Sequence, residues 1–351
     1  MKSKVEFLKK LPSKSQLIEA LGFKPEKFLI ICDRQLEKNS DVKRWLKDFT
    51  GVYAVKAGES LKDLGELSGH VKKILKLISP STPRNLCVVG VGGGTVGDFA
   101  GFIASILKRG VPLIHVPTTL LAAMDSAHGG KTALNVGEFK NQVGTFYPAE
   151  CIMLVRSLFD GLPEMQIRSA AGELAKMALI EGGEFFKATK NFRSDIDYVW
   201  EQLPHAIAAK NRWVEKDPYE KSGERQVLNL GHSLGHVLES YYGLPHGVAV
   251  GQGLIFALQW SHHQGHLTAA TEAEGEELLH GMGFLAPKDF AKKNRAMSRS
   301  KLLRLVSEDK KLVDSHHMNF VFLEDIGAPF RKKMTLESFV TETQRQGWTS
   351  L

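Results

Sequence analysis

The sequence predicts an α/β protein with a parallel sheet in its N-terminal half and a mostly α-helical C-terminal half. Short apolar segments rich in Val, Ile and Leu alternate with helical patterns up to about residue 156. Beyond that point helical periodicity dominates, and strand signals are rare until residues 317–325. A length of 351 residues suits two domains, which we expect over residues 1–156 and 157–351.

The expected strands of the first half are each bounded by polar residues, glycine or proline. They are KFLIICD (27–33), VYAVKAG (52–58), NLCVVGVGG (85–93), PLIHVPTT (112–119) and CIMLV (151–155). Helical patterns such as residues 60–78 lie between several of them, and this alternation favours a parallel sheet covered on both faces. Gly161 and Pro163 interrupt the pattern before the second half, where helices are expected over 165–180, 197–216, 231–242 and 247–263.

Composition narrows the class of partner. The net charge of +7 and the pI of about 9.1 suit anionic small molecules, a membrane surface or nucleic acid, or serve solubility alone. No zinc-finger spacing or RNA-binding aromatic motif accompanies the scattered basic pairs, and no apolar stretch is long enough to span a membrane, so neither partner is expected. The three cysteines form no CxxC motif and the N-terminus has no secretory signal, which favours a cytoplasmic enzyme.

A cluster of glycines lies where the third expected strand gives way to a helix, at positions 90, 92, 93, 94 and 97. The helix is expected to begin near Thr95–Asp98. Glycine lets a ligand approach the backbone closely, and a helix N-terminus offers free N–H groups, which together suit a pyrophosphate. The spacing G-x-G-x-x-x-G differs from the dinucleotide fingerprint. A ligand-binding turn and a purely structural turn both remain open at this stage.

A histidine cluster indicates a metal site. His232 and His236 are four residues apart, so both project from one face of the expected helix, and His246 follows in GLPHG. Imidazoles with one carboxylate are typical of transition-metal sites, and Glu173 in AAGELAK is the best candidate for that carboxylate. Spacing alone leaves open whether His232 and His236 both bind the ion.

Polar residues also gather around paired glycines in DSAHGGKTALN (125–135) and FKNQVGTF (139–146). Lysines grouped with a metal suggest an anionic, oxygen-rich substrate, whereas a polar surface loop is the alternative. The polar residues are Asp125, Lys131, Asn135, Lys140 and Asn141.

Taken together, these segments resemble the 3-dehydroquinate synthase family of sugar phosphate cyclases, from about residue 27 to residue 327. The motifs that carry the resemblance occur in the family's order: GGGTVGDFAGF, RGVPLIHVPTTLLA, DSAHGGKTALN, KNQVGTFYP, AGELAK, LNLGHSLGH, LPHG and EDKK. The resemblance implies a Rossmann-like NAD-binding domain, a helical metal- and substrate-binding domain, an active site in the cleft between them, and a homodimer.

The implied reaction is the carbon–oxygen lyase step of the shikimate pathway, which leads to aromatic amino acids. It would convert 3-deoxy-D-arabino-heptulosonate 7-phosphate to 3-dehydroquinate and phosphate. The route would comprise metal-assisted transient oxidation with NAD, phosphate elimination, re-reduction and an intramolecular aldol closure.

The resemblance also assigns residues. The implied cofactor contacts are Asp33, Glu59, Lys62, Gly93, Gly94, Gly97, Asp98, Thr118, Thr119, Lys131 and Lys140. The implied zinc or cobalt ligands are Glu173, His232 and His246, which makes His236 a substrate-side residue. The implied substrate and catalytic residues are Asp125, Lys131, Lys140, Asn141, Lys176, Lys210, Arg225, Asn229, His236, one of Lys310 or Lys311, and Arg109 from the neighbouring subunit.

One departure from the family pattern is His128, which stands where a small residue is common and which we expect to face away from the site. Two rival functions are a sister cyclase of secondary metabolism and a metal-dependent polyol dehydrogenase. The residues that favour the shikimate enzyme over the sister cyclases are Asn229, His236, Lys140, Asn141 and Arg225. A dehydrogenase would release NADH and have little use for so many phosphate-binding lysines.

Overall fold

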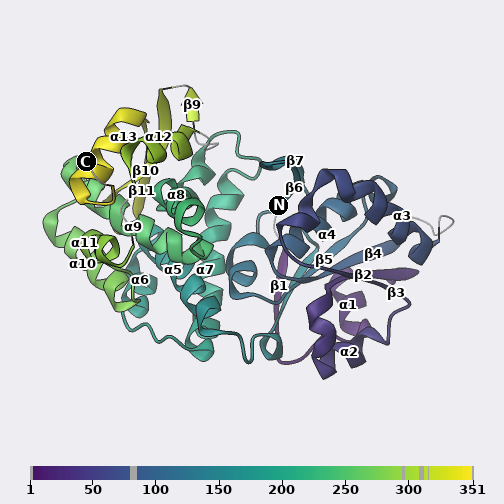
Figure 1. Ribbon diagram of the computed structural model, residues 1–351. Helices are drawn as coiled ribbons and strands as arrows, with labels where there is room; N and C mark the ends of the chain where they lie inside the picture. The colour runs from purple at the N-terminus through teal and green to yellow at the C-terminus, as the bar shows by residue number, and fades with distance from the viewer. Residues whose placement is uncertain (1–2, 80–84, 295–296, 308–311, 315, 350–351) are drawn as a thin grey trace. The chain divides into compact units, whose positions relative to one another are not determined.

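The computed structural model describes residues 3–79, 85–294, 297–307, 312–314 and 316–349. The chain divides into two compact units, Met1–Leu162 (unit 1) and Pro163–Leu351 (unit 2). Unit 1 is an α/β structure and unit 2 is mostly helical, which confirms the fold class predicted from the sequence (Figure 1).

Unit 1 contains a parallel sheet with strand order β1-β8-β5-β4-β2-β3. Its strands are β1 (Lys4–Leu8), β2 (Lys27–Asp33), β3 (Gly51–Val55), β4 (Leu86–Gly92), β5 (Leu113–Pro117) and β8 (Cys151–Val155). Every residue of β4, β5 and β8 is buried, which explains why these strands appear in the sequence as continuous apolar runs.

Helices cover both faces of this sheet. They are α1 (Lys14–Leu21), α2 (Ser40–Leu46), α3 (Leu67–Ile78) and α4 (Gly94–Ile106), and Figure 1 shows α1 and α2 on one face and α3 and α4 on the other. Leu17 of α1 and Trp45 of α2 join Ile30 and Val89 of the sheet in one apolar core. Helix α3 begins later than predicted because two 3₁₀ turns, Glu59–Lys62 and Leu64–Glu66, precede it.

Two strand features of unit 1 are absent from the sequence prediction. Strand β1 pairs with β8 at the edge of the sheet. It has charged residues at alternate positions and an exposed Phe7, so no apolar run marked it as a strand in the sequence. The polar segment after Gly130 forms an antiparallel hairpin of β6 (Lys131–Val136) and β7 (Phe139–Phe146). Most of β7 is exposed, so no apolar run marked it as a strand.

Unit 2 is built around two long buried helices, α5 (Glu164–Glu181) and α9 (His246–His263). The other helices are α6 (Gly183–Thr189), α7 (Ile196–Lys216), α8 (His232–Tyr242), α10 (Ala269–Gly281), α11 (Pro287–Lys293), α12 (Arg299–Ser307) and α13 (Leu336–Gln346). A small antiparallel sheet joins β9 (Leu312–Asp314), β10 (His317–Asp325) and β11 (Ala328–Thr335). Trp260 of α9 packs on Phe320 and Phe322 of this sheet.

The division between the units falls at Leu162 and Pro163, slightly later than the predicted boundary at residue 156. The 3₁₀ turn Arg156–Leu158 still belongs to unit 1, because Leu158 joins the core beneath the sheet and the Ser157 amide donates to the Lys9 carbonyl.

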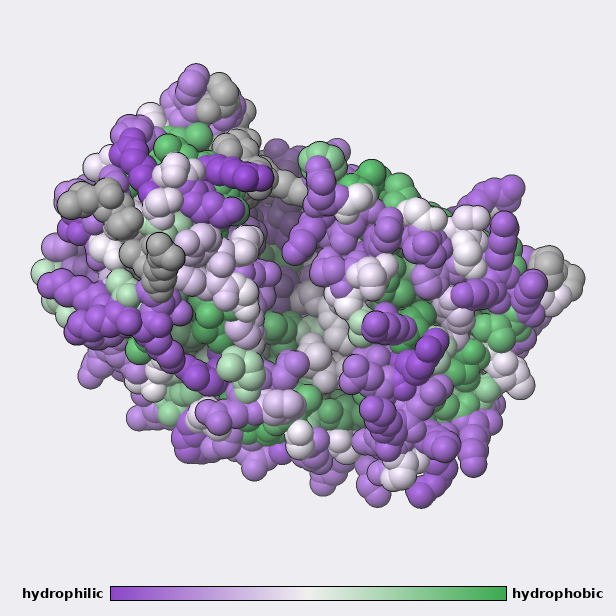
Figure 2. Space-filling view, in the orientation of Figure 1, coloured by the Kyte–Doolittle hydropathy of each residue, from purple (hydrophilic) through white to green (hydrophobic). Residues whose placement is uncertain are grey.

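Hydrophilic side chains cover much of the face of each unit that Figure 2 presents, with smaller hydrophobic patches among them. Among the described residues, no helix has both the length and the apolar character needed to cross a membrane.

Candidate active site

The glycine turn of unit 1 joins the buried strand β4 to helix α4. Gly93 adopts extended backbone angles (φ −77°, ψ −174°), and within the described part of the chain no side chain caps the N-terminus of α4. The first-turn N–H groups of this helix therefore have no capping side chain, and an anion placed there would also meet the positive end of the helix dipole.

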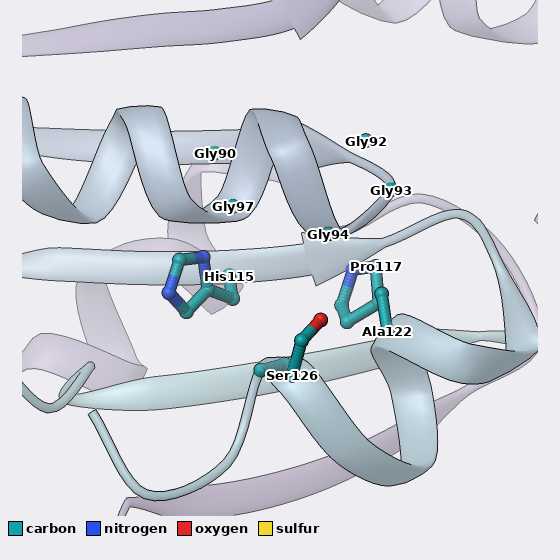
Figure 3. A pocket seen from close by; sticks show the side chains of 10 residues that line it. Gly90, Gly92, Gly93, Gly94, Gly97, His115, Pro117, Ala122 and Ser126 are labelled. Atoms are coloured by element: carbon teal, nitrogen blue, oxygen red, sulfur yellow. The ribbon is translucent and has the colours of Figure 1, made fainter. Parts of the chain in front are cut away.

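A pocket lies directly beside this turn. It is lined by Gly90, Gly92, Gly93, Gly94, Gly97, His115, Pro117, Ala122, Ser126 and Ala127. In Figure 3 the Ser126 hydroxyl points toward Gly94, and a Cβ at Gly94 would lie 3.1 Å from its oxygen. Burial lowers the pKa of His115 to about 4, so its imidazole is neutral near pH 7.

Replacing Gly94 with alanine is expected to weaken NAD binding by about tenfold or more, because the new methyl group would occupy the pocket. The backbone of Gly94 is helical, so alanine is compatible with its conformation. Titration of the protein with NAD, followed by fluorescence, would test this, with metal content as the control. NAD affinity equal to the wild type would remove the turn from the cofactor site.

Lys62 and Asp98 lie next to this turn and form an ion pair. The Lys62 ammonium is 2.6 Å from Asp98 Oδ2 and also contacts Asn141 Oδ1, while its side chain is only 4% exposed. Glu59 accepts a hydrogen bond from Asn135 Nδ2 at 2.9 Å. Glu59 and Lys62, both expected at the cofactor, are thus each held by other side chains of unit 1.

The remaining cofactor candidates of unit 1 sit at strand ends. Asp33 ends β2, and its carboxylate accepts from the Gln35 amide at 3.0 Å. Thr118 is buried after β5, and its amide donates to the Gly92 carbonyl. The Thr119 hydroxyl accepts from the Ala122 amide at 3.2 Å, so it caps the following helical turn.

The substrate candidates of unit 1 are distributed around the hairpin. Lys131 and Lys140 are exposed on β6 and β7, and Asp125 is half-buried in the preceding π-helical turn Ala122–Ser126. His128 is buried, and its Nε2 lies 2.8 Å from the Ala123 carbonyl oxygen. That contact makes the His128 ring part of the interior packing of the turn.

Arg109 lies in a backbone segment of unusual conformation. Lys108, Arg109 and Gly110 have φ angles of 53°, 69° and 112°, a region that non-glycine residues adopt at a cost of about 1–3 kcal/mol each. The Arg109 side chain is exposed.

Glu173, His232 and His246 come together in unit 2, from helices α5, α8 and α9. Each offers one ligand atom, and the three atoms lie within 4.8 Å of one another. Glu173 Oε1 is 3.6 Å from His232 Nε2 and 3.5 Å from His246 Nε2. Ligand atoms about 2.0–2.2 Å from a tetrahedral zinc ion lie roughly 3.4 Å apart, so the two sides of the triangle that meet at Glu173 Oε1 have nearly the length that such an ion requires.

The second nitrogen of each histidine is engaged elsewhere. His232 Nδ1 lies 3.2 Å from the Leu230 carbonyl oxygen, and His246 Nδ1 lies 2.8 Å from Glu239 Oε2. A carbonyl or carboxylate at Nδ1 directs the proton there and leaves Nε2 as the ligand atom. Histidines that bind a metal usually donate their second ring N–H to such an oxygen, which holds the imidazole in orientation.

Electrostatics at the triangle also favour a cation. Burial lowers the pKa of His246, but its contacts with Glu173 and Glu239 outweigh burial and raise the pKa to about 10. The carboxylates thus hold a proton at His246, and a divalent ion would replace it at Nε2. Lys176 Nζ is 2.5 Å from the other Glu173 oxygen and fixes its orientation.

Close packing of two helices brings Glu173 to His246. Gly172 precedes Glu173 on α5, and Gly247 follows His246 on α9. A Cβ at Gly172 would lie 1.8 Å from the Gly247 carbonyl oxygen, and a Cβ at Gly247 would lie 1.7 Å from the Ser169 carbonyl oxygen. Only glycine permits this backbone approach.

His232 is positioned by the same device. Gly231 precedes it with φ 78°, and a Cβ at Gly253 of α9 would lie 1.9 Å from the Gly231 carbonyl oxygen. Each of the three candidate ligands is therefore the neighbour in sequence of a glycine at a helix–helix contact.

Three other described candidates of unit 2 are His236, Lys210 and Asn229. The His236 ring lies 5.4 Å from the His232 ring and 6.0 Å from the His246 ring, centre to centre. Lys210 of α7 is buried, and Asn229 is half-buried at the end of the 3₁₀ turn Glu224–Asn229. Lys310 and Lys311 lie outside the described residues.

The loop that carries Arg225 is organised by a buried aspartate. Asp217 accepts hydrogen bonds from the amides of Lys221, Ser222 and Gly223 at 2.8–3.3 Å. Arg225 is 3% exposed, and its guanidinium donates to the Pro218 carbonyl. Sequence inspection found Arg225 but not Asp217, which holds the loop in place.

Comparisons with known proteins identify the family to which the chain belongs. Residues 52–169 match the family model 3-dehydroquinate synthase N-terminal, and residues 170–312 match 3-dehydroquinate synthase C-terminal. The chain belongs to the 3-dehydroquinate synthase family. A relative from Bartonella tribocorum, named 3-dehydroquinate synthase, is 34% identical over 309 residues, covering 85% of this chain and 80% of the relative.

Solved structures of two related cyclases share the fold of this family member. One is 2-deoxy-scyllo-inosose synthase complexed with carbaglucose-6-phosphate, NAD⁺ and Co²⁺, at a TM-score of 0.80 and 22% identity, covering 97% of this chain and 96% of that one. The other is 2-epi-5-epi-valiolone synthase from Streptomyces hygroscopicus with NAD⁺ and Zn²⁺, at 0.80 and 20% identity, covering 98% of each chain.

Glu239 is a second residue of the candidate site, after Asp217, that the sequence analysis overlooked. It lies seven positions after His232 on α8, so helical periodicity places both on one face, and that spacing was a usable signal. Its role emerged only from the contact with His246.

Replacing Glu239 with glutamine is expected to reduce metal affinity by about 10–100-fold, the range found when an outer partner of a metal-bound histidine is lost. The amide keeps the size of the side chain but removes the charge that favours the Nδ1-protonated tautomer. Competition with a chromophoric chelator would measure the Zn²⁺ or Co²⁺ affinity. An unchanged dissociation constant would show that Glu239 does not support His246.

Proposed function

We propose that this protein converts 3-deoxy-D-arabino-heptulosonate 7-phosphate to 3-dehydroquinate and phosphate, as a 3-dehydroquinate synthase. The observation that carries the proposal is the triangle of Glu173, His232 and His246, whose spacing suits a divalent ion, in a chain that belongs to this family. The proposed cofactors are NAD at the glycine turn of unit 1 and Zn²⁺ or Co²⁺ at this triangle.

When bound, the ion would polarise a substrate hydroxyl and NAD would accept and later return a hydride. The chain's own residues have three tasks around this chemistry. Glu173, His232 and His246 would hold the ion, and the Glu239 and Leu230 contacts would orient the two imidazoles. The Gly93–Gly94 turn would bind the pyrophosphate of the cofactor.

The substrate carries a phosphate and a carboxylate, so it needs several cations. The proposal assigns Lys131, Lys140, Lys176, Lys210 and Arg225 to these anionic groups. Lys176, Lys210 and Arg225 are each at most 5% exposed, and a buried cation attracts an anion far more strongly than one in water. His236, Asn141, Asn229 and Asp125 would orient the sugar hydroxyls and move protons.

An activity assay tests the proposal directly. The pure protein with the heptulosonate phosphate, catalytic NAD⁺ and Co²⁺ or Zn²⁺ is expected to release phosphate and form 3-dehydroquinate. Accumulation of NADH in an amount equal to the substrate consumed would instead indicate a polyol dehydrogenase. Cyclisation of sedoheptulose 7-phosphate, with no turnover of the heptulosonate phosphate, would indicate a secondary-metabolism cyclase.

We also propose that the enzyme is a homodimer in which Arg109 binds the substrate phosphate of the partner subunit. The exposed side chain and left-handed backbone of Arg109 support this assignment. The three cysteines are free and buried, which suits a reducing compartment, and we propose a cytoplasmic enzyme.

Replacing Arg109 with alanine is expected to raise KM for the substrate by about tenfold or more, because a charge-assisted contact to phosphate is lost. At substrate concentrations well below KM, mixed dimers of Arg109→Ala and His246→Ala subunits should regain activity, since one site then has both an intact metal triangle and an intact Arg109. Mixing Arg109→Ala with the double variant is the control and should regain none. No recovery in the first mixture would contradict a role across subunits.

A further inference from the structure

Asn135, near the end of strand β6, links two segments of unit 1 through a single side chain. Its Nδ2 donates to Glu59 Oε2 at 2.9 Å, and its Oδ1 accepts from the Asn141 amide at 2.8 Å. The residue is 7% exposed. A carboxylate can only accept and a backbone amide can only donate, so the two contacts define which end of the Asn135 amide faces which partner.

A second link runs parallel to the first. The Lys62 ammonium contacts both Asp98 Oδ2 and Asn141 Oδ1. Glu59 and Lys62 belong to one 3₁₀ turn, so the hairpin residue Asn141 is tied to that turn twice, through Asn135 and through Lys62.

The hairpin needs such ties. A two-stranded hairpin is marginally stable by itself. Strand β6 packs against helix α4, but most of β7 is exposed. Asn141 also has φ 54°, a conformation that persists only where surrounding contacts hold it. The bond from its amide to Asn135 and the contact of its side chain with Lys62 are two such contacts.

We propose that Asn135 is a positioning residue that holds the Lys140–Asn141 segment of β7 and Glu59 at a fixed separation. The inference rests on the proposed function, in which Glu59 contacts NAD and Lys140 and Asn141 contact the substrate. One amide side chain then serves both the cofactor and the substrate without touching either.

Two substitutions separate the effects of the two hydrogen bonds of the Asn135 side chain, one to Glu59 and one from the Asn141 amide. Asn135→Asp keeps the acceptor for the Asn141 amide but places an oxygen against the Glu59 carboxylate. It should weaken NAD binding by about tenfold and leave hydrogen exchange in residues 137–146 unchanged. Asn135→Ala removes both hydrogen bonds. It should therefore also speed hydrogen exchange in residues 137–146 and raise KM for the heptulosonate phosphate by about tenfold.

Exchanging the amide and the carboxylate between positions 135 and 59 should restore the NAD affinity that Asn135→Asp loses. Combining Asn135→Asp with Glu59→Gln restores a donor and an acceptor in the reverse order. We expect the NAD dissociation constant of the double variant to fall to within about threefold of that of Glu59→Gln alone. A residue with only a general structural role would give no such recovery.

The measurements are NAD titration and hydrogen exchange followed by mass spectrometry, both on the full-length protein, with circular dichroism to verify folding. The proposal is overturned if Asn135→Ala leaves exchange in residues 137–146 at the wild-type rate, or if the swap fails to restore NAD affinity. Absence of turnover by the wild-type protein would refute the proposed function instead. In that case the exchange rates of the Asn135 variants still decide whether the residue holds the hairpin.

Discussion

Replacing His246 with alanine is expected to lower turnover of the heptulosonate phosphate by about a thousandfold or more. A bound ion supplies several kcal/mol of transition-state stabilisation, and each 1.36 kcal/mol corresponds to a tenfold change in rate. The substitution removes one corner of the triangle and leaves Glu173 Oε1 and His232 Nε2, which lie 3.6 Å apart, as the remaining ligand atoms.

The measurement is phosphate release with saturating Co²⁺ or Zn²⁺, together with the metal content of the purified variant. Glu239→Gln is the matched control, because it keeps all three ligand atoms and should lose metal affinity but regain activity as the metal concentration rises. Full activity of His246→Ala, with metal still bound, would refute the assigned ligand set. Removing the ion from the wild-type protein with a chelator should reproduce the loss, and adding Co²⁺ should reverse it.

Replacing Gly172 with alanine is expected to destabilise the protein by about 3 kcal/mol or more, at the upper end of the range for overpacking. The new Cβ would lie 1.8 Å from the Gly247 carbonyl oxygen, and that atom is backbone within helix α9, so it cannot rotate away. Helices α5 and α9 would have to separate, which would also draw Glu173 away from His246. For a unit of this size the melting temperature should fall by roughly 6–12 °C.

Thermal unfolding followed by circular dichroism would measure this, and metal titration of the folded variant would test the effect on the triangle. Gly69→Ala is the control, because Gly69 lies on an exposed part of α3 and its Cβ would meet no atom within 4 Å. That change should be neutral or stabilising by up to about 1 kcal/mol. If Gly172→Ala melted at the wild-type temperature, the close helix approach would be incorrect.

Buried elements were the ones that the sequence predicted best. Strands β2 and β8 have the predicted bounds, and α8 and α9 begin one residue from the predicted starts. Burial selects apolar residues at many positions of these elements, so the hydrophobic pattern of the sequence reveals where they lie. Strand β1 and the β6–β7 hairpin lie at an edge or at the surface, where that requirement is absent, and pattern alone did not reveal them.

The candidate site divides in a similar way. Residue type and motif order are properties of the sequence, and the resemblance that they carry identified Glu173, His232 and His246 as the expected metal ligands. Helical spacing treated His232 and His236 alike, and only the packed structure brings the Nε2 atoms of His232 and His246 to one Glu173 oxygen.

The sequence by itself determined the fold class, the family and the residue types available for a metal, a dinucleotide and an anionic substrate. Tertiary structure decided which nitrogen of each histidine faces Glu173, that Glu239 supports His246, and that Asn135 ties the hairpin to the Glu59–Lys62 turn. The physical reason is that these contacts join segments far apart in the chain. Their distances depend on how closely helices and loops pack, as at Gly172 and Gly247, and no local spacing encodes that approach.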